Sequence, residues 1–229
     1  MRSNLIQATC VCSVLFTAGS AAAGFVAGTV DPFGDAGSVS NGVNNTYASS
    51  SSSVTGGLWN TRSISAATLN TANATSQVTV GGGSAVFSVT RVGGAVTTGT
   101  NQKARLSYSS TNGGPDFTNF TSLQFDYSST LGGSIGVRVF LAGMTSGSYV
   151  QSSLTGVSGT LTISAASFAL DPALANNVTT LTIELFRQAS NASGALTITN
   201  LVANGAAIPA PGAVALLGAA GLIGMRRRR

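Results

Sequence analysis

The chain has 229 residues, only 7% of them charged, and a formal net charge of +5. Five of its eleven Lys and Arg residues lie at the two ends, so the six that remain balance the six Asp and Glu residues of the body. A neutral body without a basic stripe interleaved with aromatic residues excludes nucleic-acid binding.

The N-terminus is typical of a secretory signal peptide over residues 1–23. The short positive segment MRSN precedes an apolar segment, residues 5–16, and then the small residues TAGSAAA. Ala21 and Ala23 occupy the A-x-A positions, which predicts cleavage by signal peptidase after Ala23. Both cysteines lie inside this segment, so the mature chain has no disulfide and must be stabilised by its core.

The first motif of the body is DPFGD. Its carboxylates, Asp31 and Asp35, are candidate ligands for a structural Ca²⁺ ion together with backbone carbonyls. The alternative is an Asp-Pro turn closed by ordinary side-chain hydrogen bonds. No other metal and no cofactor is expected.

Residues 39–57, which include the run SSSSSVTGG, are low in complexity and predict a long loop or poorly ordered edge strands. Trp59, the only tryptophan, follows two glycines. Trp59, Tyr47 and Tyr149 are the aromatic residues least embedded in alternating segments. They are therefore candidates for a platform on which a sugar ring stacks, with core packing as the alternative for Trp59.

About nine short segments between residues 77 and 204 alternate apolar and polar residues, which predicts β-strands. They are QVTV, SAVFSVTRV, ARLSYSS, SLQFDYS, GVRVFLA, SYVQSSL, TLTISAASF, TLTIELFRQ and ALTITNLVANG. One helical turn is expected at residues 167–177, capped by Asp171. The pattern predicts an all-β fold, an antiparallel β-sandwich of jelly-roll type, over residues 24–204.

Catalysis has few candidate residues in this body. Without His or Cys, the mature domain cannot form a Ser-His-Asp or Cys-His nucleophile or a His-based zinc site. Glycoside hydrolysis needs two carboxylates that face one cleft. Asp126 and Glu184 lie mid-strand on outward faces, where a solvated sheet surface is the simpler interpretation. We therefore expect the chain not to be an enzyme.

The chain has a characteristic order of segments, namely VDPFGDAGSV, then GGLWNTRSI, then many short strands. In this order it resembles secreted bacterial jelly-roll proteins of the carbohydrate-binding-module type. The resemblance covers most of residues 30–204 and depends on this order of segments more than on single residues. It implies the fold, and fold does not imply function.

The C-terminal segment, residues 209–229, follows a short spacer at residues 205–208. Its uncharged stretch, residues 213–225, precedes four arginines. Counted from Pro211, the stretch would be about 22 Å long as a helix, against about 30 Å for a hydrocarbon core. It is thus a marginal membrane span whose Arg end stays in the cytoplasm.

This tail resembles the PEP-CTERM sorting signal, which exosortases read in many Gram-negative bacteria that make extracellular polysaccharide. The residues that carry the resemblance are Pro209, Pro211, the apolar helix, and Arg226, Arg227, Arg228 and Arg229. Ala210 stands where that family has Glu. The resemblance implies a transient inner-membrane anchor, cleavage by an exosortase near Pro209, and release to or attachment at the cell surface.

The sequence therefore predicts an exported, non-enzymatic component of the cell surface or exopolysaccharide matrix. The alternative is a carbohydrate-binding module that uses Trp59, Tyr47 and Tyr149. A glycoside hydrolase is a more distant third hypothesis.

Overall fold

The computed structural model describes residues 27–43, 45–69, 73–93, 101–145, 149–188 and 192–206. All of them belong to one compact unit, Gly24–Ile208. The expected signal peptide, with Ala21 and Ala23, and the expected sorting tail lie outside these ranges. None of the helical segments within the described ranges has the length and apolar character needed to cross a membrane.

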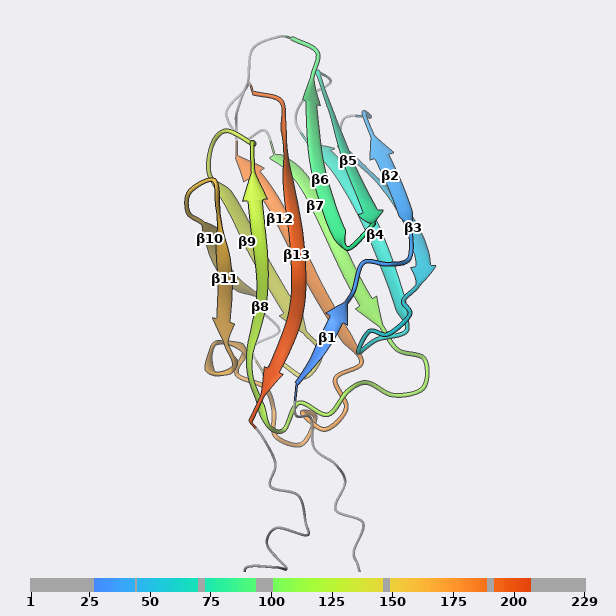
Figure 1. The fold of residues 1–229 in the computed structure, drawn as a ribbon, viewed down its shortest axis with the longest axis vertical. Coiled ribbons are helices and arrows are strands. Elements are labelled where there is room, and N and C mark those ends of the chain that lie inside the picture. The colour runs from blue at the N-terminus through green and yellow to red at the C-terminus, as the bar shows by residue number, and fades with distance from the viewer. Residues whose placement is uncertain are drawn as a thin grey trace, which may run out of the picture. The chain divides into compact units, whose positions relative to one another are not determined.

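The described chain folds into two antiparallel β-sheets packed as a sandwich (Figure 1). Sheet A has the order β11-β8-β13-β6-β5-β2, with β1 paired to β13 beside that path. Its strands are β1 (Ala27–Asp31), β2 (Gly37–Asn41), β5 (Ala74–Gly81), β6 (Ser84–Arg91), β8 (Phe120–Ser129), β11 (Ser158–Ser164) and β13 (Gly194–Gly205).

Sheet B has the order β10-β9-β12-β7-β4-β3. Its strands are β3 (Thr46–Ser53), β4 (Thr61–Leu69), β7 (Asn101–Ser109), β9 (Ile135–Leu141), β10 (Val150–Leu154) and β12 (Thr180–Gln188). From β6 to β9, and again from β10 to β13, each successive strand lies in the other sheet. Repeated crossing between two sheets is the arrangement of double-sheet jelly rolls.

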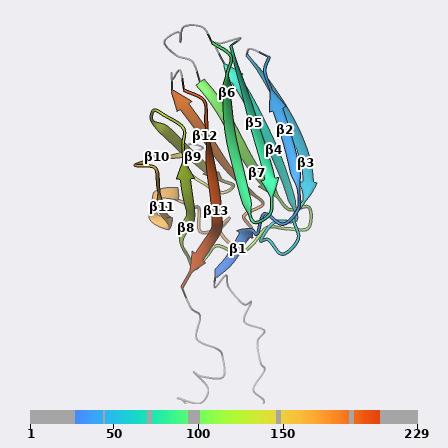
Figure 2. The ribbon, with the colours of Figure 1, turned by 45° about the horizontal axis from the view of Figure 1, so that its top comes forward.

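All nine predicted strands are present, and the predicted faces are confirmed. Leu181, Ile183 and Leu185 of β12 all point into the core, because successive side chains of a strand alternate between its two faces. Before residue 77, the sequence offered strands only as one of two alternatives for residues 39–57, a long loop or edge strands. Residues 39–57 contain the end of β2 and all of β3, which are edge strands of the two sheets and lie side by side in Figures 1 and 2. The edge-strand alternative for this stretch is thus confirmed, although its serine-rich sequence shows no apolar alternation.

The expected helical turn takes a different form. A short 3₁₀ helix covers Ala165–Phe168, before the predicted cap. Asp171 does behave as a cap, since its Oδ1 accepts a hydrogen bond from the backbone N–H of Ala173 at 2.9 Å, but a turn rather than a helix follows it.

The core lies between the two sheets and ends in an aromatic cluster. Trp59 contacts Tyr108 and Phe117, and Phe117 stacks on Phe120 with ring centroids 4.6 Å apart. Every strand and every core residue of the described ranges belongs to Gly24–Ile208. We therefore expect this unit, which has the size of a domain and its own core, to fold independently.

Candidate functional site

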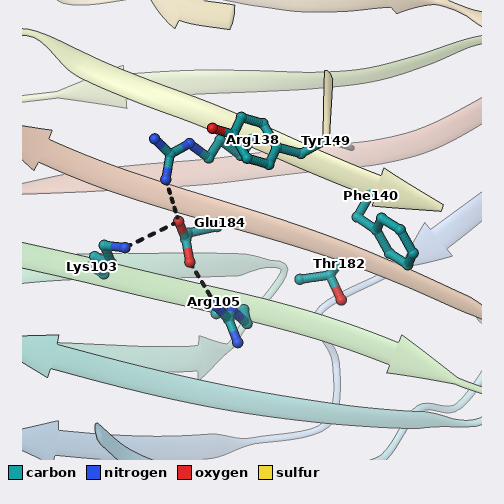
Figure 3. A pocket seen from close by; sticks show the side chains of 7 residues that line it. All are labelled: Lys103, Arg105, Arg138, Phe140, Tyr149, Thr182 and Glu184. Atoms are coloured by element: carbon teal, nitrogen blue, oxygen red, sulfur yellow. Dashed lines mark hydrogen bonds and ion pairs between the residues drawn. The ribbon is translucent and has the colours of Figure 1, made fainter. Parts of the chain in front are cut away.

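The candidate site is a pocket on the outer face of sheet B (Figure 3). The alternation that buries Leu181, Ile183 and Leu185 turns Thr182 and Glu184 to the opposite face of the strand. The pocket has a volume of about 320 Å³ and is lined by Lys103, Arg105, Arg138, Phe140, Tyr149, Thr182 and Glu184.

The strand register brings residues that are distant in sequence into one row across the sheet. Glu184 of β12 lies directly opposite Arg105 of β7 on one side and Arg138 of β9 on the other. The row continues to Ser65 of β4 and to Gln151 of β10. Neighbouring strands are about 4.8 Å apart, so every neighbour in this row is within side-chain reach.

Glu184 is the centre of an ion-pair network. Its Oε2 lies 2.7 Å from Nη2 of Arg105, and its Oε1 lies 3.3 Å from Nη1 of Arg138 and 3.5 Å from Nζ of Lys103. These neighbours leave Glu184 only 7% exposed. Burial by itself would raise the pKa of Glu184, but the hydrogen bond from Arg105 and the three positive charges outweigh it and lower that pKa below its ordinary value. Glu184 is therefore a carboxylate at neutral pH.

Arg138 is held in place by two aromatic rings. Its guanidinium carbon lies 4.5 Å from the ring centroid of Tyr149 and 4.4 Å from that of Phe186. Its Nε donates to Oε1 of Gln151 at 3.2 Å. Cation–π stacking and this hydrogen bond pre-organise the guanidinium, so less side-chain entropy is lost when a ligand binds it.

A second row on the same face carries hydroxyl groups and aromatic surface. Thr182 pairs with Ser107, which pairs with Ser63 of β4, and on its other side Thr182 pairs with Phe140. The hydroxyl of Thr182 donates to that of Ser107 at 3.2 Å. Phe140 is 36% exposed and Tyr149 49% exposed. Hydroxyl groups, charged groups and exposed rings thus share one surface.

The three aromatic residues chosen from the sequence have different positions. Tyr149 lines the pocket, and Tyr47 lies at the surface on β3, where the guanidinium of Arg105 is 5.9 Å from its ring centroid. For Trp59 the surface platform is wrong and the alternative, core packing, is confirmed. Its side chain is fully buried and its Nε1 donates to the backbone oxygen of Val178 at 3.0 Å. The largest side chain gains more from burial in the core than from exposure beside a glycine-rich loop.

The predicted Ca²⁺ ligands contact groups of the chain itself. Oδ2 of Asp31 lies 2.6 Å from Nη1 of Arg62, and this ion pair is almost fully buried. The carboxylate of Asp35 accepts a hydrogen bond from the backbone N–H of Thr55. The backbone carbonyl oxygen of Asp35 accepts a hydrogen bond from Nη2 of Arg62. Within the described ranges, no three His, Cys, Asp or Glu side chains are grouped as metal ligands. The guanidinium of Arg62 thus supplies the positive charge beside Asp31.

The two carboxylates considered for glycoside hydrolysis do not converge. Asp126 lies on β8 of sheet A and accepts hydrogen bonds from Asn200 and Thr160, which lower its pKa. Glu184 lies on sheet B. Because Asp126 and Glu184 occupy the outer faces of opposite sheets, they cannot flank one glycosidic bond.

The sequence did not identify the residues that surround Glu184 in the pocket. Arg105 and Arg138 occupy polar positions of predicted strands and Lys103 directly precedes one of them. This accumulation of cations was the signal that the sequence offered. The alternation of apolar and polar residues does not predict which strands are neighbours or in which register they pair.

No family model matches the chain, and no curated protein matches it. Among solved structures, the chain is similar to a family 11 carbohydrate-binding module from Clostridium thermocellum in complex with a β-1,3-1,4-mixed-linked tetrasaccharide. The two sequences are 15% identical, the TM-score is 0.40, and the alignment covers 79% of this chain and 96% of the module. A solution structure of the CtCBM11 module is similar at 18% identity and a TM-score of 0.41, over 82% and 99% of the two chains. A carbohydrate-binding module specific for non-crystalline cellulose follows at 13% identity and a TM-score of 0.34, over 45% and 66%. Similarities of this size do not assign a function.

Proposed function

We propose that the Gly24–Ile208 domain is a non-enzymatic carbohydrate-binding module whose binding surface is the outer face of sheet B. The observation that supports this function best is the composition of the pocket. Two exposed rings, Tyr149 and Phe140, lie beside the hydroxyl of Thr182 and a fixed cluster of charged groups in one hollow.

This composition suits a sugar better than an apolar molecule. The C–H faces of a pyranose ring stack on aromatic rings, while its hydroxyl groups need donors and acceptors at fixed positions. The ion pairs around Glu184 and the stacking of Arg138 hold the polar side chains in place before a ligand arrives. A pre-organised surface of this kind binds with a smaller entropic cost.

The test is affinity electrophoresis or calorimetry of the domain against soluble polysaccharides. Tyr149→Ala should weaken binding about tenfold, which corresponds to about 1.4 kcal/mol of lost stacking. Leu174 is also a large exposed side chain but lies outside the pocket, so Leu174→Ala is the matched control and should leave affinity unchanged. If the wild-type domain binds no glycan, the role predicted first from the sequence, a structural component of the matrix, becomes the better hypothesis.

We further propose that the chain is exported and sorted, so that this module acts at the cell surface or in the exopolysaccharide matrix. Support comes from the order of sequence elements alone: a signal peptide that ends at Ala23, and a Pro-Ala-Pro element, an apolar stretch and four arginines at the C-terminus. The partners implied are signal peptidase, an exosortase and, transiently, the inner membrane.

A further inference from the structure

Cations gather on the outer face of sheet B although the body as a whole is neutral. Three of its six Lys and Arg residues line the pocket, namely Lys103, Arg105 and Arg138. Glu184 is the single acid among the described lining residues. The other five acids of the chain, which do not line it, are Asp31, Asp35, Asp116, Asp126 and Asp171. The pocket therefore carries a local excess of two positive charges.

Glu184 does not use all the hydrogen-bond donors of these cations. A guanidinium has five N–H donors and an ammonium has three, whereas the two oxygens of Glu184 make one short contact, with Arg105, and two longer ones. The side chain of Arg105 is 43% exposed, and Glu184 contacts only its Nη2. Donors therefore remain for an anionic group from solution.

We propose that the ligand of this surface is an acidic polysaccharide, whose anionic groups bind Arg105 and Lys103 while its sugar rings contact Tyr149 and Phe140. This inference rests on the proposed carbohydrate binding and specifies the class of glycan. A guanidinium binds a carboxylate or sulfate group with paired hydrogen bonds, which are stronger than those between neutral groups. Glu184 is then an internal counter-ion, which holds the cations in position and at the same time repels the ligand.

The remainder of this face favours a polysaccharide over a nucleic acid. The row next to the charged one carries the hydroxyls of Ser51, Ser63, Ser107 and Thr182, which match the hydroxyl groups of sugars. Strong binding of a phosphodiester chain draws on many cations, because each neutralised phosphate adds to the affinity. The pocket offers three, and one carboxylate offsets part of their charge.

The experiment measures the affinity of the Gly24–Ile208 domain for four polymers. This domain contains the whole core, and it lacks the four C-terminal arginines, which would themselves bind polyanions. The probes are polygalacturonate, dextran sulfate, neutral dextran and oligodeoxythymidine. The wild-type domain should bind an acidic polysaccharide at least about tenfold more tightly than dextran, and this preference should shrink as NaCl rises from about 50 to 200 mM.

Two substitutions should act in opposite directions. Arg105→Gln should weaken binding of the acidic polysaccharide about tenfold and leave dextran binding unchanged. Glu184→Gln should strengthen binding of the acidic polysaccharide by several-fold, because it removes the repelling charge. If Glu184 were only a structural residue, the same substitution would weaken binding.

Each substitution has a matched control on sheet A. Asp126→Asn removes the same negative charge as Glu184→Gln but on the opposite outer face, and Arg91→Gln removes a cation from β6. Neither should change the affinity for any of the four polymers. Thermal unfolding checks that every variant is folded. Should Glu184→Gln fail to fold, the comparison of Arg105→Gln with Arg91→Gln decides whether the cations of the pocket bind the acidic polysaccharide.

The outcomes separate this inference from the proposed function. Equal affinity for the acidic polysaccharides and for dextran would overturn the acidic ligand and leave carbohydrate binding in place. Tighter binding of oligodeoxythymidine than of both acidic polysaccharides would also overturn it, in favour of a phosphodiester ligand. No binding to any glycan would overturn both proposals. A preference between polygalacturonate and dextran sulfate would support the inference and identify the anionic group.

Discussion

Phe186 lies directly opposite Gly136 in the pairing of β12 with β9, and its ring occupies the space that a Cβ atom at Gly136 would need. The same ring carries the guanidinium of Arg138 on its surface. The absence of a side chain at Gly136 thus leaves room for the ring of Phe186, and that ring positions Arg138, a cation of the pocket. Gly136 therefore shapes the pocket although it does not line it.

Gly136→Ala should therefore destabilise the domain and disturb the site together. Because the added methyl group forces Phe186 out of its position, we expect a loss of about 1–3 kcal/mol in the free energy of unfolding, as in other overpacked sites. Urea denaturation measures the loss, and the affinity for polysaccharide should fall as Arg138 is displaced. The control is Gly34→Ala, since a Cβ at Gly34 meets nothing within 4 Å. Equal stabilities of the two variants would contradict this account of Phe186.

The buried pair of Asp31 and Arg62 links β1 of sheet A to β4 of sheet B. Arg62→Met should lower the free energy of unfolding by about 3–5 kcal/mol, because it leaves the carboxylate of Asp31 buried without a counter-charge. The double variant Arg62→Met/Asp31→Asn should recover part of this loss in urea denaturation. A chelator should leave the melting temperature of the wild-type domain unchanged. A fall in that temperature with EDTA would instead support the Ca²⁺ ion first suggested by the sequence.

The lowered pKa of Glu184 predicts how stability depends on pH. When the folded-state pKa of a carboxyl group lies below its unfolded-state value of about 4.3, the unfolded chain binds the proton more readily. The stabilisation by Glu184 is therefore fully present above pH about 4.3 and is lost as the pH falls through the folded-state pKa. Melting temperatures measured across this range should fall less steeply for Glu184→Gln than for the wild-type domain. Parallel curves would show that the carboxylate contributes nothing to acid sensitivity.

The proposed sorting route predicts two cleavages. In the native host, the intact mass of the surface protein should correspond to a chain that begins at Gly24 and has lost the residues after the Pro209–Pro211 region. Ala210→Glu introduces the residue that the PEP-CTERM pattern has at this position. The yield of cleaved protein should stay the same or rise. A chain recovered from the surface fraction with Arg229 still present would contradict sorting by an exosortase.

Alternation of apolar and polar residues was sufficient to predict the strands from β5 to β13 and their buried faces. The physical reason is that a strand packed on one side must place an apolar residue at every second position. For β3 the sequence left a loop and an edge strand open, because its serines occupy an exposed edge, where no apolar residue is required. The short polar strand is instead stabilised by its backbone pairing with β4.

The position of Trp59 could not be read from its neighbours. Gly56, Gly57 and Asn60 are typical of a surface loop, and a loop around a buried ring has the same local composition. Burial of Trp59 depends on the backbone oxygen of Val178, which lies far away in sequence and accepts its hydrogen bond. A long-range contact of this kind leaves no local pattern.

The sequence by itself determined the class of fold, the outward position of Glu184 on its strand, and the neutrality of the body, because these follow from local alternation and from composition. Only the tertiary structure decided that Arg105, Arg138 and Glu184 belong to one row, since the register between strands is set by long-range pairing. It also decided that Arg62 is buried against Asp31 while Arg105 stays partly exposed. Both are arginines on strands of sheet B. The face of the sheet to which each points decides whether it forms a core ion pair, as Arg62 does, or remains a surface cation, as Arg105 does.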